Sequence, residues 1–269
     1  MYNFVKPALI TEKFMLPSNG KLYKENGSSF DGNITLRAMT TMEERMRLGN
    51  QDFYEAMVPI VNECIVDNKK ADGSYIIDSK YLTVADFDAI CIKLRNITYG
   101  PKYRTFAKCT TCGRVFQYTA DLTDLEFNFL PDDFTEPYDI GPLPRSGDTL
   151  GCRFLRISDR LEIDKEAMEF RTKNPEFTGS PEYTLEMIRR IVTINGEKVD
   201  PIMAKMYVES MIGADSDYYH RKIDNIKYGV AKGGIVDCKF KDDMISPCNG
   251  KAIFGVQSNS EFFRAGEDY

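Results

Sequence analysis

Apolar positions recur at helical spacing in two long stretches of the first half of the chain. Across residues 53–66 they stand three and four residues apart, which predicts a helix with one apolar stripe and a kink or restart at Pro59. A second stripe spans residues 83–97, where Thr83 is suited to cap the start and Gly100 to end the helix. Both stripes are predicted to face the core.

Alternating apolar and polar positions predict strands on either side of these helices. Residues 33–39 alternate as a half-buried strand of a hairpin does, and a helix is predicted to begin near Thr41, where a hydroxyl precedes acidic residues. Residues 103–106 and 115–118 flank a tight turn and predict a second hairpin. Residues 1–14 show no period and predict an extended arm.

The second half is predicted to follow a similar order. Residues 121–139 are rich in acidic, aromatic and Pro residues without a period, so they are the predicted linker. Asn195–Gly196 is a strong turn signal. The predicted elements are a strand at 152–157, helices at 160–171, 182–194, 200–212 and 216–229, and a hairpin at 238–256.

Two pairs of short strings indicate that one design occurs twice. NITYG at residues 96–100 precedes Cys109 by nine residues, and NIKYG at residues 225–229 precedes Cys238 by nine, so the offset is 129 in both cases. The turn LPSNG at 16–20 has a counterpart LPRSG at 143–147, with an offset of 127. The predicted fold class is therefore α+β and internally duplicated. Two helix-plus-hairpin half-domains are expected, at residues 1–138 and 139–269.

Four of the seven cysteines close the two halves and predict one shared metal site. Cys109 and Cys112 form a CxxC turn followed by Gly, and such a turn places two thiolates on one side, as tetrahedral zinc requires. The duplication aligns this pair with Cys238 and Cys248, which have nine residues between them. We therefore predict a structural Zn²⁺ ion held by all four thiolates, which would join residues far apart in sequence.

Other uses of the thiols stay open at this point. Free buried thiols are one alternative, and redox chemistry is another, although a redox CxxC begins a helix whereas residues 115–118 predict a strand. Cys64, Cys91 and Cys152 lie on apolar faces and are expected to serve packing. An odd number of cysteines favours a reducing compartment over a disulfide framework.

Composition narrows the classes of function. The 269 residues are 42% hydrophobic and 28% charged, as in an ordinary globular protein. A net charge of -6 and a pI near 5.1 make nucleic acid an unlikely ligand, because phosphate binding needs clustered Lys and Arg. No apolar run approaches the roughly 18 residues of a membrane span, and the N-terminus lacks the order of a signal peptide, so a soluble intracellular protein is predicted.

The sequence contains none of the common enzyme motifs that we considered. A Walker or dinucleotide loop, a nucleophile elbow and HExxH are all absent, so no catalytic and no cofactor-binding residue is predicted. The single histidine, His220, is expected to be solvated or to cap a helix. The acidic pairs at 132–133 and 242–243 lack calcium-loop spacing and are expected to be solvated.

Aromatic clusters lie outside the predicted apolar stripes. Aromatic residues make up 12% of the chain, and all are Phe or Tyr. Clusters at residues 127–129, 218–219 and 262–263 suit contacts with other proteins, whereas local packing under loops is the alternative.

Four strings together resemble a known family. They are LPSNGKLY at residues 16–23, ITLRAMTTMEE at 34–44, CTTCG at 109–113 and EFFR at 261–264. With these strings the chain resembles zinc-knuckle proteins of contractile-tailed phages, related to the T-even baseplate hub subunits and hub-assembly factors. The resemblance implies a non-enzymatic structural or assembly protein of the tail baseplate that contacts other tail proteins. It also implies that the protein is in the host cytoplasm during assembly and in the tail baseplate of the virion. A homo-oligomer within the baseplate stays open.

Two other functions fit parts of the sequence. A zinc-ribbon adaptor that binds transcription machinery or nucleic acid would show a basic face, and the acidic balance argues against it. A carboxylate-dependent hydrolase would need two acidic side chains that converge in a cleft.

Overall fold

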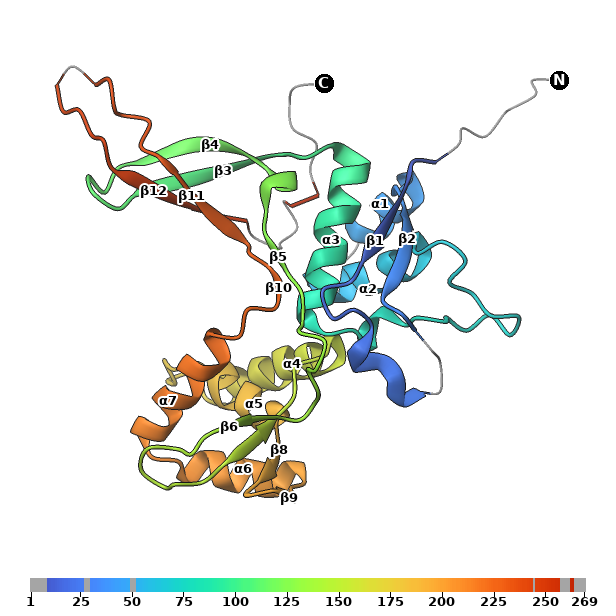
Figure 1. The fold of residues 1–269 in the computed structure, drawn as a ribbon, viewed down its shortest axis with the longest axis vertical. Helices are drawn as coiled ribbons and strands as arrows, with labels where there is room; N and C mark the ends of the chain where they lie inside the picture. The colour runs from blue at the N-terminus through green and yellow to red at the C-terminus, as the bar shows by residue number, and fades with distance from the viewer. Residues whose placement is uncertain (1–8, 27–29, 49–51, 244, 257–261, 264–269) are drawn as a thin grey trace.

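The computed structural model describes residues 9–26, 30–48, 52–243, 245–256 and 262–263. Within these ranges the chain forms seven α-helices, two four-stranded antiparallel sheets and two two-stranded ones (Figure 1). The predicted α+β class is therefore confirmed. In the same ranges, no helix combines the length and the apolar character that a membrane crossing requires.

The first helices form where the apolar stripes predict them. Thr83 caps α3 by accepting the backbone N–H of Asp86, and Asp52 caps α2 in the same way. Pro59 lies inside α2 without ending it. Residues 1–8 of the predicted arm lie outside the described residues, and residues 11–15 form a strand rather than an arm. The elements are β1 (Thr11–Met15), the 3₁₀ helix η1 (Lys21–Asn26), β2 (Asn33–Arg37), α1 (Thr41–Leu48), α2 (Phe53–Cys64), η2 (Ser79–Tyr81) and α3 (Val84–Tyr99).

Both cysteine hairpins belong to one sheet, which extends away from the helices at the upper left of Figure 1. Its strand order is β11-β12-β3-β4, so a hairpin from the middle of the chain pairs with one from its C-terminal part. The joining pair is β12 with β3, in which Ala252 lies opposite Cys109. The strands are β3 (Lys102–Cys109), β4 (Val115–Asp121), β11 (Gly233–Asp237) and β12 (Lys251–Gly255).

The rest of the chain builds a second sheet covered by helices, drawn at the bottom of Figure 1. Its strand order is β6-β7-β8-β9. The segment between the two parts contains η3 (Leu122–Asp124) and β5 (Phe127–Asn128), and β5 pairs with β10 (Gly229–Val230). The other elements are β6 (Tyr138–Ile140), β7 (Leu150–Cys152), α4 (Ile157–Lys173), α5 (Pro181–Arg190), β8 (Ile191–Ile194), β9 (Glu197–Lys198), α6 (Pro201–Ser210) and α7 (Gly213–Asp224).

Three boundaries in this second part differ from the prediction. The strand expected at 152–157 ends at Cys152, because the carboxylate of Asp159 caps α4 at Ile157. The helix expected at 182–194 ends at Arg190, because the β-branched residues that follow pair with β7 as strand β8. The helix expected at 216–229 spans Gly213–Asp224 instead.

Buried apolar side chains form two clusters. The first combines residues 14–125 with Ile157 and with C-terminal residues such as Ala252 and Phe254, while the second lies within residues 138–223. The C-terminal hairpin thus packs with the first half of the sequence. The predicted boundary between two half-domains at residues 138 and 139 stays a prediction. Residues after this boundary contribute to both clusters.

Three of the six aromatic residues in the predicted contact clusters are buried. Phe262 and Phe263 are buried in the first cluster, where Phe263 stacks on Phe53, and Tyr219 is buried in the second. Phe129 is exposed. Phe262, Phe263 and Tyr219 therefore pack locally, which is the alternative to a contact with another protein.

The two LPxxG turns are held by equivalent contacts. The carboxylate of Asp86 in α3 accepts the backbone N–H of Ser18 at 3.0 Å. The carboxylate of Asp215 in α7 accepts the backbone N–H groups of Arg145 and Ser146 at 2.7 and 3.0 Å. Both aspartates are buried. Each LPxxG turn is therefore tied to the first turn of a helix that begins about 65 residues later in the chain.

A second pair of equivalent contacts precedes α1 and α4. Arg37 forms an ion pair with Glu43 and Arg153 forms one with Asp159, each with an N–O distance of 2.7 Å. Each carboxylate also accepts, at 2.7 Å, the backbone N–H of the residue three positions before it. Each arginine donates to the carbonyl oxygen of the residue that follows it. The same arginine-and-carboxylate clamp thus starts a helix in both parts of the chain.

Candidate metal centre

The structure brings the four predicted thiols together at the tips of the two hairpins. Cys109 ends β3 and Cys112 lies in the following turn, whereas Cys238 follows β11 and Cys248 precedes β12. The sulfur atoms of Cys109 and Cys248 are 3.7 Å apart, and those of Cys112 and Cys238 are 3.9 Å apart. All four sulfur atoms lie within 4.8 Å of one another.

These distances suit a tetrahedral metal site. A metal–sulfur bond of about 2.3 Å in a tetrahedron places the sulfur atoms about 3.8 Å apart. A disulfide bond would be about 2.05 Å long, so the four thiols are free. Four cysteines are one of the donor sets of structural zinc sites, and four protein ligands fill the coordination of the ion. The residues present therefore fit a structural zinc ion.

Backbone hydrogen bonds fix both hairpins beneath the sulfur atoms. The N–H of Cys109 donates to the carbonyl oxygen of Arg114 and that of Cys238 to Gly250, each at 2.9 Å. The N–H of Thr110 donates to the carbonyl oxygen of Lys251 at 2.9 Å, which ties one hairpin to the other. These hydrogen bonds hold the two hairpins against each other next to the four sulfur atoms.

Two glycines beside the sulfur atoms meet different needs, one of a turn and one of a close approach. Gly113, after the CxxC turn, has φ of +72°, which favours glycine. A Cβ atom on Gly250 would lie 2.3 Å from Oγ1 of Thr111 and 3.1 Å from the sulfur of Cys109. Gly250 is therefore required for the close approach of the second hairpin to the first.

Arg114 fastens the long loop between the second cysteine pair to the CxxC turn. Its guanidinium forms an ion pair with Asp243 at 2.8 Å and donates to the carbonyl oxygen of Ser246 at 2.6 Å. The guanidinium carbon lies 3.9 Å from the ring centroid of Phe240. Its Nε also donates to the sulfur of Cys112 at 3.4 Å, which lowers the pKa of that thiol to about 6.

Sequence reasoning missed Arg114 and placed Asp243 among solvated residues. The only local signal for Arg114 is its position directly after CTTCG. The ion pair with Asp243 crosses 129 residues of sequence, so no periodicity predicts it.

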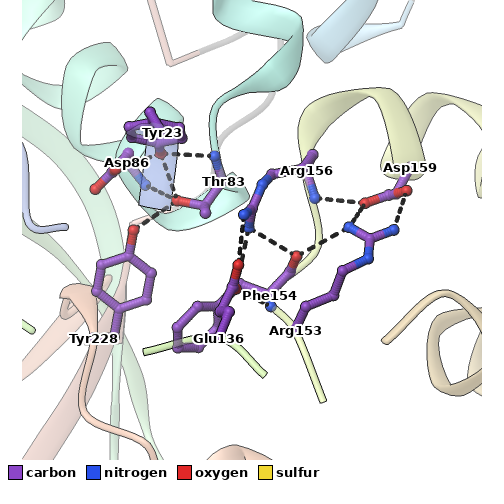
Figure 2. Close-up of polar contacts among 9 residues, drawn as sticks. All are labelled: Tyr23, Thr83, Asp86, Glu136, Arg153, Phe154, Arg156, Asp159 and Tyr228. Carbon is purple, nitrogen blue, oxygen red and sulfur yellow. Dashed lines mark hydrogen bonds and ion pairs between the residues drawn. The ribbon is translucent and has the colours of Figure 1, made fainter. Parts of the chain in front are cut away.

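A polar network lies where the two parts of the chain meet (Figure 2). The hydroxyl of Tyr23 donates to the carboxylate of Asp86 at 2.5 Å and also accepts the backbone N–H of Thr83. Oγ1 of Thr83 and the hydroxyl of Tyr228 are 2.7 Å apart. Burial raises the pKa of Asp86. Tyr228 belongs to the string NIKYG, which therefore contacts the start of α3.

The same junction contains a backbone pairing and a half-buried ion pair. Leu155 accepts the N–H of Val84 at 3.0 Å, and Leu82 accepts the N–H of Ile157 at 2.9 Å. Arg156 forms an ion pair with Glu136 at 2.6 Å (Figure 2). The two backbone hydrogen bonds join residues about 70 positions apart, which explains why the sequence did not predict the junction.

The remaining cysteines and the histidine have packing roles. Cys64, Cys91 and Cys152 are buried, as predicted. The prediction that His220 is solvated or caps a helix is wrong, because His220 lies inside α7 and its ring stacks on Tyr183 with centroids 4.1 Å apart. Burial lowers the pKa of its imidazole. Within the part of the chain that the structure describes, the cysteine cluster is the one group of three or more His, Cys, Asp or Glu side chains placed to hold a metal ion.

Comparison with known families decides the identity. Residues 8–214 match the sequence model of a family described as T4 bacteriophage base plate protein. The chain belongs to this family. As a member of the T4 base plate family it has a structural role in a phage baseplate, contacts other tail proteins and is located in the virion tail. Neither the curated proteins nor the solved structures contain a match to the chain. The family match ends before Cys238 and Cys248, so the second cysteine pair lies outside it.

Proposed function

We propose that this baseplate protein is a hub-type structural or assembly subunit in which one structural zinc ion fastens two hairpins. Cys109, Cys112, Cys238 and Cys248 would hold the ion, and the subunit would act through contacts with other tail proteins, without catalysis. The observation that supports this most is the pairing of sulfur atoms from residues more than 120 positions apart, at 3.7 and 3.9 Å.

The zinc ion would supply folding energy at the ends of the two hairpins. Binding free energies of roughly 10 to 16 kcal/mol are known for structural zinc in small domains, which exceeds the stability of many whole domains. Four protein ligands leave no open position for a reacting water, which supports a structural role over a catalytic one. The sheet would then be a rigid part of a larger assembly.

We also propose that the chain arose by duplication of one unit. Two observations support it: the buried aspartates that hold the LPxxG turns, and the arginine-and-carboxylate clamps before α1 and α4. The two LPxxG turns are 127 residues apart and the two aspartates are 129 residues apart. The repeated strings have the same two offsets.

Metal analysis of natively purified protein tests the zinc site. We expect one zinc per chain in the wild type and loss of zinc in Cys112→Ser, with Cys152→Ser as the control because Cys152 is a free thiol in the second core. Wild-type protein without zinc, or Cys112→Ser protein that retains it, would contradict the site.

Mass spectrometry of purified virions and of infected lysates tests the hub-type role. Stoichiometric copies in virions would indicate a subunit that stays in the baseplate, after assembly in the host cytoplasm. Presence only in assembly intermediates would indicate an assembly factor. Absence from both would contradict the proposed role.

One observation supports the alternative of a zinc-ribbon adaptor for transcription machinery or nucleic acid. The segments 101–121 and 230–256, which we call the sheet unit, contain eight Lys or Arg and four Asp or Glu residues, a net charge of +4. The whole chain has 35 basic and 41 acidic residues, so the remainder has 27 and 37, a net charge of -10. Salt-dependent binding of a fluorescent DNA duplex by the wild type would favour this alternative.

A further inference from the structure

The outer face of the four-stranded sheet carries an apolar row across its strands. Ile235 of β11 lies opposite Ile253 of β12. Ile253 lies opposite Lys108 of β3, which in turn lies opposite Val115 of β4. Phe106 is two residues before Lys108 and therefore projects from the same face of β3. Opposed side chains have Cβ atoms about 5 Å apart, so these five residues form one continuous surface, which we call the outer patch.

The outer patch is exposed, although its composition resembles a buried surface. Phe106, Val115, Ile235 and Ile253 are 68, 55, 69 and 54% exposed. The alternate residues Ala107, Phe116 and Ala252, on the other face, are buried in the first core cluster. An antiparallel sheet with one solvated face normally has polar residues there. A second apolar face therefore indicates an interaction surface.

The patch also has a hollow that can receive a side chain. A hollow of about 320 Å³ lies beside Phe106, with Arg104, Gln117 and Gly255 among the residues that line it. Gly255 lines this hollow, and the space at its Cα is open because glycine has no side chain to fill it. A partner side chain with an apolar body and a polar tip matches a hollow that is lined by Phe106 and by polar residues such as Arg104 and Gln117.

Charge indicates the chemistry of the partner. The outer patch has Lys108 at its centre and lies within the sheet unit, whose net charge is +4. Three ion pairs lie within that unit, Asp121 with Lys102, Asp237 with Lys251 and Asp243 with Arg114, and each cancels one charge of either sign, so the basic excess remains. One further basic residue, Lys232, pairs with Asp88 outside the unit. The rest of the same chain has a net charge of -10, so a second copy supplies the complementary surface.

We propose that the outer patch docks onto the acidic part of a second copy of this chain. The inference rests on the proposed role as a baseplate subunit, and names the partner of one of its surfaces. The contact joins two different surfaces, so it is heterologous, and such a contact repeats from copy to copy until a ring closes. An apolar centre with a charged rim is the usual composition of a protein–protein interface, which favours a protein over nucleic acid here.

Sedimentation velocity of the natively purified, zinc-containing chain tests the inference. Protein concentrations up to about 100 μM are high enough to detect contacts of micromolar affinity. At these concentrations we expect oligomers whose fraction falls as salt is added. Ile253→Glu places a negative charge in the patch and should weaken association about tenfold or more. The matched control is Ile245→Glu, in the long loop of the same sheet unit, because Ile245 is 96% exposed and outside the patch.

Circular dichroism and thermal unfolding show whether Ile253→Glu remains folded. If it does not, Ile253→Thr, which keeps a β-branched side chain, replaces it with the same expected direction. A monomer at every concentration, or association that Ile253→Glu leaves unchanged, would overturn the inference. DNA binding that Ile253→Glu abolishes, without self-association, would also overturn it. A monomer that holds one zinc and is present in virions would overturn this contact alone and leave the baseplate role standing.

Discussion

Asp86 and Asp215, 129 residues apart, hold corresponding turns of the chain by the same contact. Each is buried near the start of a helix. Asp86 accepts one backbone N–H of its LPxxG turn, and Asp215 accepts two. A buried donor that loses its acceptor remains unpaired away from water, which is why both positions require a carboxylate or an equivalent acceptor.

Replacing Asp215 should destabilise the second part of the chain. Asp215→Ala leaves the N–H groups of Arg145 and Ser146 without their acceptor, so we expect the free energy of unfolding to fall by about 1 to 3 kcal/mol for each. Urea unfolding followed by circular dichroism measures it. Asp217→Ala on the same helix is the control, because the exposed ion pair of Asp217 with Arg221 contributes about 0.5 kcal/mol or less. Equal effects of the two variants would contradict this role of Asp215.

A methyl group on Gly250 should weaken the metal site. The Cβ atom of Gly250→Ala would overlap Thr111 and press on the sulfur of Cys109, so the second hairpin must move away from the first. We expect faster zinc loss to a chelator than in the wild type. Gly213→Ala is the control, because the space around Gly213 is open and alanine suits a helix. Unchanged zinc retention in Gly250→Ala would show that the hairpins do not need this close approach.

Loss of Arg114 should release the loop between Cys238 and Cys248. Arg114→Ala removes the ion pair with Asp243 and the stacking on Phe240, so we expect faster hydrogen exchange and faster proteolysis in the loop. Lys108→Ala, on the same hairpin and with an exposed side chain, should leave the loop unchanged. Equal protection of the loop in wild type and Arg114→Ala would contradict the clamp.

The ion pair of Glu43 should make stability depend on acid pH. Burial by itself would raise the pKa of Glu43, but hydrogen bonds from Arg37 and Thr40 outweigh it and lower the pKa to about 2. A carboxylate with a depressed pKa stabilises the fold above its unfolded pKa of about 4.3, and this contribution is lost as pH falls toward 2. At pH 7 the contribution is at most about 3 kcal/mol.

Glu43→Gln therefore should be less stable than the wild type at pH 7, and the difference should shrink as pH falls from about 5 to 3. Unfolding midpoints of both proteins are measured across that pH range, and the difference between them is compared. Effects of acid on the cysteines are common to both proteins and cancel in this difference. Glu209→Gln, on an exposed helix face, should show no such trend. A difference that stays constant with pH would exclude the clamp as its cause.

The extent to which the sequence predicts this structure depends on how local each signal is. Helices α2 and α3 are predictable because their apolar stripes, the cap at Thr83 and the stop at Gly100 are all local. The end of α5 is not, because Ile191 continues an apolar helical pattern and becomes a strand only through pairing with β7. Tertiary pairing overrides the local pattern there.

The candidate site follows the same rule. The convergence of the four cysteines is predictable, because the repeated strings align Cys109 with Cys238 across 129 residues. The clamp of Arg114 and the network of Tyr23 with Asp86 are not, because each depends on partners brought close only by the folded chain. The outer patch could be recognised only after the strand register placed Ile235, Ile253 and Val115 in one row.

X-ray absorption at the zinc edge of the natively purified protein tests the central claim most directly. We predict one zinc per chain with four sulfur neighbours at about 2.3 Å, and fewer than four in Cys248→Ser. A zinc ion bound by only two sulfur atoms and by oxygen or nitrogen, or no zinc at all, would contradict a metal centre shared by the two hairpins.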